Sequence, residues 1–242
     1  GKYKNESEIL DQVKKMLTEG ATFIDVGAYS SRPGATHISE KAELARIIHI
    51  VKLLVNHFPN IIISVDTFRS AVAQQSIEAG AAIINDISGG KMDNNMFETV
   101  AKLQVPYIMM HMLGTPQNMQ QNPTYTNVTK EITSFFAAQI FKLHQLKVND
   151  VLVDVGFGFG KTTAHNYELL KNLALFKNLD APILAGISRK SMLYKPLEIS
   201  PKAALNATTS ANTIALLNGA NILRVHDVKE AMEAIKIVAQ LS

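Results

Sequence analysis

Residues 61–86 read IIISVDTFRSAVAQQSIEAGAAIIND and contain one complete strand–helix–strand unit. The β-branched run Ile61–Asp66 predicts a buried strand, and the amphipathic stretch Ser70–Ala79 predicts the helix after it. Gly80 can take the left-handed conformation that ends a helix, and a second β-branched run follows at Ala82–Asn85. This order is typical of the βα units that build a parallel sheet.

The same alternation runs through all 242 residues. Short apolar runs that end in a polar residue predict seven strands, at Thr22–Val26, Ile61–Asp66, Ala82–Asn85, Tyr107–His111, Val151–Asp154, Ile183–Ala185 and Ile222–Val225. Longer amphipathic stretches predict eight helices, at Glu6–Glu19, Ser39–His57, Ser70–Ala79, Asn94–Leu103, Asn127–Leu146, Ala164–Leu173, Pro201–Asn218 and Val228–Ala239. No linker or shift in composition divides the chain, so we expect a single domain over residues 1–242.

We expect an α/β fold, the (β/α)8 TIM barrel, rather than a flavodoxin-like open sheet, because polar residues recur at the carboxyl end of each strand. Seven strands are one too few for such a barrel. The sequence opens on a predicted helix at Glu6 and starts with Gly rather than Met, so we expect strand 1 to be absent from the front of the sequence. The strands flanking the gap would then expose four apolar residues, Phe23, Ile24, Ile222 and Leu223.

Composition excludes several classes of protein. The hydrophobic content of 47% is too high for a disordered or fibrous chain, and the net charge of +3 is too small to favour a nucleic-acid partner. The absence of cysteine excludes disulfides, thiolate nucleophiles and thiolate metal sites. No apolar run approaches the roughly 18 residues of a membrane span. We therefore expect a cytoplasmic protein with no membrane partner.

Polar and ionisable residues gather where the predicted strands end, which is where barrel enzymes carry their active sites. They are Asp25, Asp66, Asn85 with Asp86, His111, Asp154, and Arg224 with His226. Any single Asp or Asn there is also explained as a helix N-cap. A whole ring of such groups favours a binding site.

The glycine-rich stretch DVGFGFGKT, residues 154–162, does not match either nucleotide-binding motif. A P-loop needs Gly where Val155 stands, and a dinucleotide fingerprint needs two residues where only Phe159 lies. The stretch is better interpreted as a loop that presents Phe159 and the ammonium of Lys161 beside Asp154. A packing loop with a solvated lysine is the alternative.

Three basic segments indicate an anionic substrate. Ser30–Gly34 and Ser188–Ser191 combine hydroxyls with basic side chains, and the second opens a helix whose N-terminus favours anions. In the third segment, 224–227, Arg224 and His226 point the same way because alternate residues of an extended chain share a face. A solubilising role is the alternative for any one of these arginines.

Together these motifs resemble the dihydropteroate synthases, a family of pterin-binding barrel enzymes. The matching segments occur in the family's order and spacing, and they are FIDVGAYSSRPGA (23–35), SVDTF (64–68), IINDISGG (83–90), DVGFGFGK (154–161), GISRKS (186–191) and RVHDV (224–228). The resemblance extends from Glu6 to the end of the sequence. It implies a transferase of folate biosynthesis, a target of sulfonamides, that joins 6-hydroxymethyl-7,8-dihydropterin diphosphate to p-aminobenzoate.

The resemblance also implies roles for individual residues. Those expected to bind the pterin are Asp66, Asn85, Asp154 and Lys190, and those expected to bind the diphosphate are Arg224 and His226. Those expected around p-aminobenzoate are Ser31, Arg32, Pro33, Phe159, Ser188 and Ser191. The catalytic contribution is expected from Asp154, Lys190, Arg224 and His226, with Mg²⁺ as cofactor, and the assembly is expected to be a homodimer.

Two departures from the family pattern stand out. Val155 replaces the usual Pro, which frees the backbone slightly. The family's first strand and mobile loop, with an Asn that helps to hold the metal, do not precede Gly1. Two alternatives therefore stay open: a pterin-binding methyltransferase of the same superfamily, and an inactive pterin-binding fragment.

Overall fold

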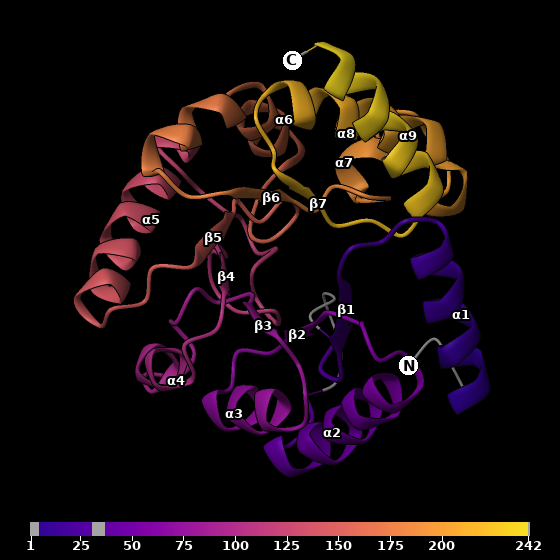
Figure 1. The fold of residues 1–242 in the computed structure, drawn as a ribbon. Coiled ribbons are helices and arrows are strands. Elements are labelled where there is room, and N and C mark those ends of the chain that lie inside the picture. Colours follow the sequence, from indigo (N-terminus) through magenta and orange to yellow (C-terminus); the bar gives the residue numbers. More distant parts are fainter. Residues whose placement is uncertain (1–4, 31–36, 242) are drawn as a thin grey trace.

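Seven parallel strands curl into one sheet that is surrounded by helices (Figure 1). This is a computed structural model, and it describes residues 5–30 and 37–241. The strands pair in chain order, and their bounds are β1 Ile24–Gly27, β2 Ile63–Asp66, β3 Ile83–Asp86, β4 Tyr107–Met110, β5 Val151–Asp154, β6 Ile183–Ala185 and β7 Ile222–Leu223. All seven predicted strands are confirmed, with shifts of up to two residues at their ends.

The helices also follow the prediction closely. The α-helices are α1 Glu6–Thr18, α2 Glu40–His57, α3 Ser70–Glu78, α4 Met96–Leu103, α5 Val128–Gln145, α6 Thr163–Lys171, α7 Ser191–Tyr194, α8 Leu205–Leu217 and α9 Val228–Val238. Three 3-10 helices join them, η1 Leu173–Leu179, η2 Pro201–Ala203 and η3 Ala239–Leu241. The pattern missed α7 and η1, which are too short to show a period. Within the described residues, no helix combines the length and apolar character needed to cross a membrane.

Side-chain caps fix where several helices begin. Asn5 accepts a hydrogen bond from the backbone of Glu8 at 2.9 Å, and Asn127 accepts one from Lys130 at 2.8 Å. Thr162 forms a capping box with His165 at the start of α6. Each cap satisfies an amide at the helix N-terminus that has no partner within the helix.

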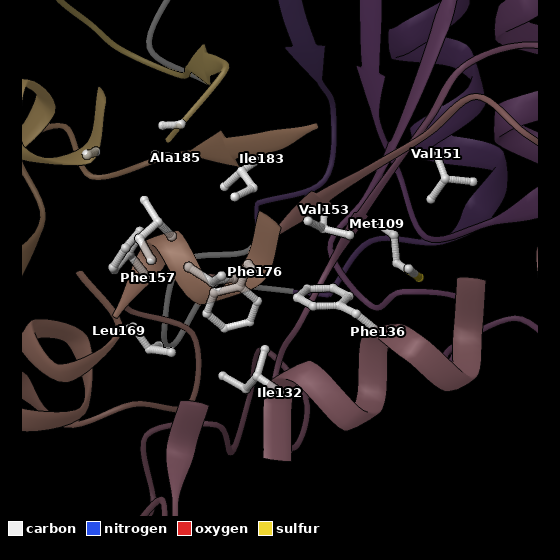
Figure 2. Packing of buried hydrophobic residues seen from close by; sticks show 14 of the residues in the cluster. Met109, Ile132, Phe136, Val151, Val153, Phe157, Leu169, Phe176, Ile183 and Ala185 are labelled. Atoms are coloured by element: carbon white, nitrogen blue, oxygen red, sulfur yellow. The ribbon is translucent and has the colours of Figure 1, made fainter. Parts of the chain in front are cut away.

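Alternation along the strands separates two apolar layers. Between the sheet and the helices lies the main core, whose large buried residues include Met109, Phe136, Val153 and Phe176 (Figure 2). The residues on the other face of the strands form a small separate cluster, which comprises Ile83, Ile108 and Leu184. This cluster is the apolar floor of the barrel interior, because alternate strand residues point to opposite faces.

The same alternation corrects one expectation about the ring of polar residues. Asn85 lies on the face of Ile83, inside the barrel, whereas Asp86 lies on the opposite face and is fully buried. Asp86 accepts hydrogen bonds from the Tyr107 hydroxyl at 2.7 Å and from the backbone of Ser88 at 2.7 Å. Asp86 therefore stabilises the β3–α4 loop and is not part of the barrel mouth.

The two edges of the sheet, β1 and β7, face each other without backbone pairing in the described residues. The predicted gap is thus present, although the ring of helices continues past it. There α1 and α9 lie side by side, and a Cβ on Gly20 would lie 3.2 Å from the Met232 side chain (Figure 1).

The expected exposure beside the gap is only partly correct. Phe23 is 38% exposed, as expected, but Ile24 is only 4% exposed. Ile24 is buried because its side chain belongs to the cluster formed with α1 and α2. Ile222 and Leu223 are half-buried, since the first packs on the barrel floor and the second on the main core.

A buried ion pair ties α2 to the loop after β2. Both carboxylate oxygens of Glu43 are engaged, one by Arg69 at 2.5 Å and the other by the Thr67 hydroxyl at 2.8 Å. The guanidinium of Arg69 also lies over the rings of Tyr29 and Phe68. The Glu43 side chain is 1% exposed and that of Arg69 is 11% exposed, so neither charge can turn to water.

Glu43→Gln should lower the free energy of unfolding by about 3–5 kcal/mol, because it leaves the Arg69 guanidinium buried without a counter-charge. Urea denaturation measures the loss. Glu40→Gln, an exposed change in the same helix, is the matched control and should cost about 1 kcal/mol or less. Equal losses in the two variants would show that the buried pair contributes nothing special to stability.

Candidate functional site

Charged side chains from the last strands and loops converge at the carboxyl end of the barrel. A Cβ placed on Gly186 would lie 3.7 Å from Asp154 Oδ2, 3.9 Å from Lys190 Nζ and 3.9 Å from the Cβ of Arg224. Asp154 ends β5 and accepts a hydrogen bond from the Gly156 backbone at 2.8 Å. Three of the four predicted catalytic residues therefore surround one glycine, whose missing side chain leaves room between them.

Arg224 connects this group to the first strands. Its Nε donates to Asp25 Oδ2 at 2.7 Å, and its Nη2 lies 3.7 Å from Asp66 Oδ2. The second oxygen of Asp25 accepts from the Asn85 amide nitrogen at 3.2 Å. The register places Asp66 beside Asn85 on neighbouring strands. All four predicted pterin-binding residues and Arg224 thus belong to one continuous cluster.

Asp25 is the member of this cluster to which the family resemblance assigned no role. The sequence placed it in the polar ring at the strand ends, but it gave no partner for it. Strand parity supplied a usable signal, because Asp25 opposite Ser64 faces the same side as Asp66. Its contacts with Asn85 and Arg224 join the two halves of the cluster.

Burial shifts the pKa values of the central groups towards neutrality. Burial and the nearby Asp25 carboxylate raise the pKa of Asp66 to about 7, although Arg224 opposes the shift. Burial also raises the pKa of Asp154, against the charges of Lys190 and Arg224. Burial lowers the pKa of Lys190 to about 8, with Asp154 acting in the opposite direction. Near pH 7, Asp66 and Lys190 can therefore both donate and accept protons or hydrogen bonds.

The glycine-rich loop after β5 contacts the side chain of Lys190. The Lys190 ammonium lies 4.8 Å from the centre of the Phe159 ring and donates a hydrogen bond to the Phe157 carbonyl. Phe159 is half-buried, so one part of its ring stays accessible. The structure thus places the Phe159 ring beside Lys190.

Lys161 and His111 are not presented at the mouth, contrary to the sequence analysis. The Lys161 residue is 3% exposed, and its ammonium donates to the Phe159 carbonyl at 3.0 Å and to the His111 carbonyl at 3.2 Å. The chain can fold back over this lysine because Gly156 and Gly160 take positive φ angles, a conformation that side chains disfavour. Lys161 therefore lies beneath the loop.

The second basic segment is also only partly as expected. Arg189 turns away from the mouth and binds Asp227 through Nε at 2.8 Å and Nη2 at 2.9 Å. Its backbone has a positive φ of 55°, and its side chain reaches Asp227 at the start of α9 and the carbonyls of Pro201 and Lys202 in η2. Ser188 is buried, and its hydroxyl lies 3.0 Å from Nδ1 of His226, which orients that imidazole. Ser191 is half-buried at the first position of α7.

Three predicted residues of the p-aminobenzoate site, Ser31, Arg32 and Pro33, lie outside the described residues. The remaining predicted residues all lie at or next to the carboxyl end of the barrel. Among the described residues, no group of three or more His, Cys, Asp or Glu side chains is arranged to hold a metal ion.

Asp66→Asn should stabilise the ligand-free protein at pH 8 by up to about 4 kcal/mol, since the pKa of Asp66 rises by about three units and one unit corresponds to about 1.36 kcal/mol. A carboxyl group whose pKa rises from 3.8 to about 7 on folding contributes its stability below pH 4 and loses it as the pH rises through 7. The gain of the Asn variant should therefore shrink towards zero as the pH falls to 4. Urea denaturation at both pH values measures it, and a gain that is independent of pH would contradict the shifted pKa.

Comparison with known proteins agrees with this geometry. Residues 1–226 match the family model described as pterin binding enzyme. The dihydropteroate synthase of Escherichia coli K12 is 41% identical over 237 residues, which cover 96% of this chain and 83% of that protein. The Haemophilus influenzae dihydropteroate synthase is 39% identical and is matched over 86% of its length.

Solved structures give the same result. A Yersinia pestis dihydropteroate synthase in complex with a sulfonamide drug superimposes with a TM-score of 0.93 at 40% identity, covering 98% of this chain and 86% of that one. A Xanthomonas albilineans dihydropteroate synthase with 4-aminobenzoic acid gives a TM-score of 0.91 at 33% identity, covering 99% and 86%. The fold is that of these TIM barrels, and the chain belongs to the dihydropteroate synthases, a family of transferases.

Proposed function

We propose that this chain condenses 6-hydroxymethyl-7,8-dihydropterin diphosphate with p-aminobenzoate to give 7,8-dihydropteroate and diphosphate. The observation that carries this proposal is the convergence of Asp154, Lys190 and Arg224 around Gly186. One carboxylate beside two cations suits a substrate that joins a heteroaromatic ring to an anion. A pterin-binding methyltransferase is less favoured, because the relatives described above are named synthases and its reaction has no diphosphate to bind.

The pterin ring would lie on the apolar floor and be bound at its edges by Asp66, Asn85, Asp154 and Lys190. The side-chain N–H of Asn85 donates a hydrogen bond to Asp25, so the amide oxygen of Asn85 would accept a hydrogen bond from the ring. Asp66, with a pKa of about 7, can bind a ring nitrogen as an acceptor or a donor. These complementary groups would select an aminopyrimidinone over a plain aromatic ring.

The reaction would begin with cleavage of the bond between the pterin methylene carbon and the diphosphate oxygen, which leaves with the electron pair. Arg224 and His226 would offset the charge that grows on this leaving group. The Asp154 carboxylate would stabilise the positive pterin. The arylamine nitrogen of p-aminobenzoate then bonds to the methylene carbon and releases a proton. This scheme requires no protein nucleophile.

The second substrate would lie beside Phe159 and Lys190. The Phe159 ring would contact the aromatic face of p-aminobenzoate, and the start of α7 with Ser191 would face its carboxylate. Ser188 would act indirectly, by orienting the imidazole of His226. We also assign Ser31, Arg32 and Pro33 to this site by family resemblance.

Magnesium remains part of the proposal. Mg²⁺ commonly binds through substrate phosphates, water and one or two carboxylates. Asp25 and Asp66 are the nearest candidates to Arg224, but both are engaged by it, so the diphosphate would provide most of the ligands. The ion would neutralise part of the charge on the leaving group.

Lys190→Ala and Arg224→Ala should each lower kcat/KM by about 100-fold or more, because each removes a cation aimed at the reacting groups. Formation of dihydropteroate from radiolabelled p-aminobenzoate measures the effect. The exposed changes Lys195→Ala and Arg46→Ala are the matched controls and should retain parent activity. Unchanged diphosphate release in the Arg224 variant would refute the role of that residue, and an inactive parent chain would refute the proposed function.

We also infer a cytoplasmic homodimer. The sequence has no cysteine, which suits a reducing compartment. The C-terminal helices expose large apolar side chains, among them Leu217, Ile237 and Leu241 at 56%, 68% and 73%. Such side chains on neighbouring helices are typical of a surface that a second copy covers.

Sedimentation velocity should therefore show twice the mass of one chain at micromolar concentration. Ile237→Asp should shift the protein towards the monomer, because it places a charge in the apolar contact. Leu175→Asp, an exposed change in η1, should leave the dimer intact. A monomeric parent would contradict the inference.

A further inference from the structure

Lys161 is a buried cation that the proposed reaction does not use. It follows the segment of residues 156–160, which we call the glycine loop, and it is 3% exposed. Its ammonium contacts three uncharged acceptors, the Phe159 carbonyl at 3.0 Å and the carbonyl and Nδ1 of His111 at 3.2 Å each. Among the ion pairs of the described residues, none involves Lys161. Burying an ammonium without a counter-charge costs free energy, even when the group is hydrogen-bonded.

The buried side chain of Phe157 anchors the start of the glycine loop in the main core, and the rest of the loop packs mainly through its backbone. A Cβ on Gly156 would lie 2.0 Å from the His111 carbonyl oxygen, and a Cβ on Gly160 would lie 2.6 Å from that of Leu113. The loop therefore packs backbone to backbone on the segment after β4. Beyond Phe157 these contacts supply few apolar side chains, so hydrogen bonds are needed to fix residues 158–160.

Several of these hydrogen bonds come from outside the barrel. The hydroxyl of Tyr125 donates to the Gly160 carbonyl at 2.9 Å, and the Gln120 amide donates to the Gly158 carbonyl at 2.6 Å. Of the three side chains Gln120, Tyr125 and Lys161, only Lys161 binds the carbonyl of Phe159. Lys161 is thus the side chain that binds the backbone carbonyl of Phe159, whose ring meets Lys190 and also packs against the cluster that contains Met110 and Met112.

The surroundings of Lys161 keep it a hydrogen-bond donor. Burial and the nearby lysine charges lower the pKa of His111 to about 2, so that its Nδ1 can accept a hydrogen bond. Burial lowers the pKa of Lys161 to about 7, with Asp154 opposing and Lys190 reinforcing the shift. Both the ammonium and the neutral amine carry N–H groups, so the contact with the Phe159 carbonyl survives either protonation state.

We propose that Lys161 is a positioning residue that holds the glycine loop so that the Phe159 ring and the Phe157 carbonyl meet Lys190, and thereby sets the affinity for p-aminobenzoate. It acts through the loop, because its side chain is enclosed and does not reach the substrates. The inference rests on the proposed function, since it concerns the second substrate of that reaction. Of the pterin-binding residues, Asp66 and Asn85 lie on β2 and β3, and Asp154 is held by β5, so binding of the pterin should depend on Lys161 less than binding of p-aminobenzoate does.

Lys161→Met and Lys161→Gln test this role. Met keeps the length of the side chain without a donor, whereas Gln keeps an uncharged donor. Steady-state kinetics with both substrates should show that Met raises KM for p-aminobenzoate about tenfold, as expected for the loss of a buried hydrogen bond. KM for the pterin diphosphate should stay within about twofold, and Gln should recover most of the loss. Lys171→Met on the exposed face of α6 is the control.

The proposal fails if Met leaves both KM values unchanged or impairs both substrates equally. A double-mutant cycle with Phe159→Leu adds a second criterion, because the effect of Lys161→Met should largely disappear once that ring is gone. Additive effects would overturn the mechanism through Phe159.

A crystal structure of ligand-free Lys161→Met separates this inference from the proposed function. The Phe159 ring should leave its place beneath Lys190 even if the chain proves inactive. An unmoved ring would overturn the positioning role, whereas an inactive parent with a moved ring would count only against the function.

Discussion

The guanidinium of Arg224, held between Asp25 and Asp66, is the interaction on which the rest of the site depends. It extends from the loop after β7 to β1 and β2, and so joins the two edges of the sheet that lack backbone pairing in the described residues. The nearby carboxylates raise the pKa of Arg224, which keeps it charged at all pH values of interest. A fixed cation at this position makes the accumulation of carboxylates in the barrel mouth tolerable.

Asp25 connects Arg224 to the pterin-binding residues through its two carboxylate oxygens. One of its oxygens binds Arg224 and the other binds Asn85, so the groups proposed for the diphosphate and for the pterin are held by one carboxylate. A displacement of Arg224 towards a bound anion would alter the charge felt by Asp66 and the orientation of the Asn85 amide. In the proposed reaction, binding of the leaving group and recognition of the ring would therefore be electrostatically linked.

Most of the fold could be predicted from sequence because each βα unit carries its own pattern. Strands β5 and β6 match their predicted bounds, since β5 is a β-branched run that ends in Asp154 and β6 is a short apolar run between Pro182 and Gly186. The errors lie where tertiary contacts decide. Arg189 and Lys161 belong to loops whose positive φ angles were not visible in the pattern, and both side chains turn into the protein rather than to the mouth. Asp86 could have been separated from Asn85 by strand parity alone.

The same reasoning explains how the glycine loop tolerates Val155 in place of the family's usual proline. The sequence suggested a slightly less rigid loop, because valine leaves φ free. In the structure Val155 is fully buried in the main core beside Phe157, so packing rather than a ring restricts its backbone. Rigidity at the start of the loop thus comes from the core, and rigidity at its end comes from Lys161 and Tyr125. A loop restrained at both ends can leave Gly158 and Phe159 accessible to substrate without losing its place beneath Lys190.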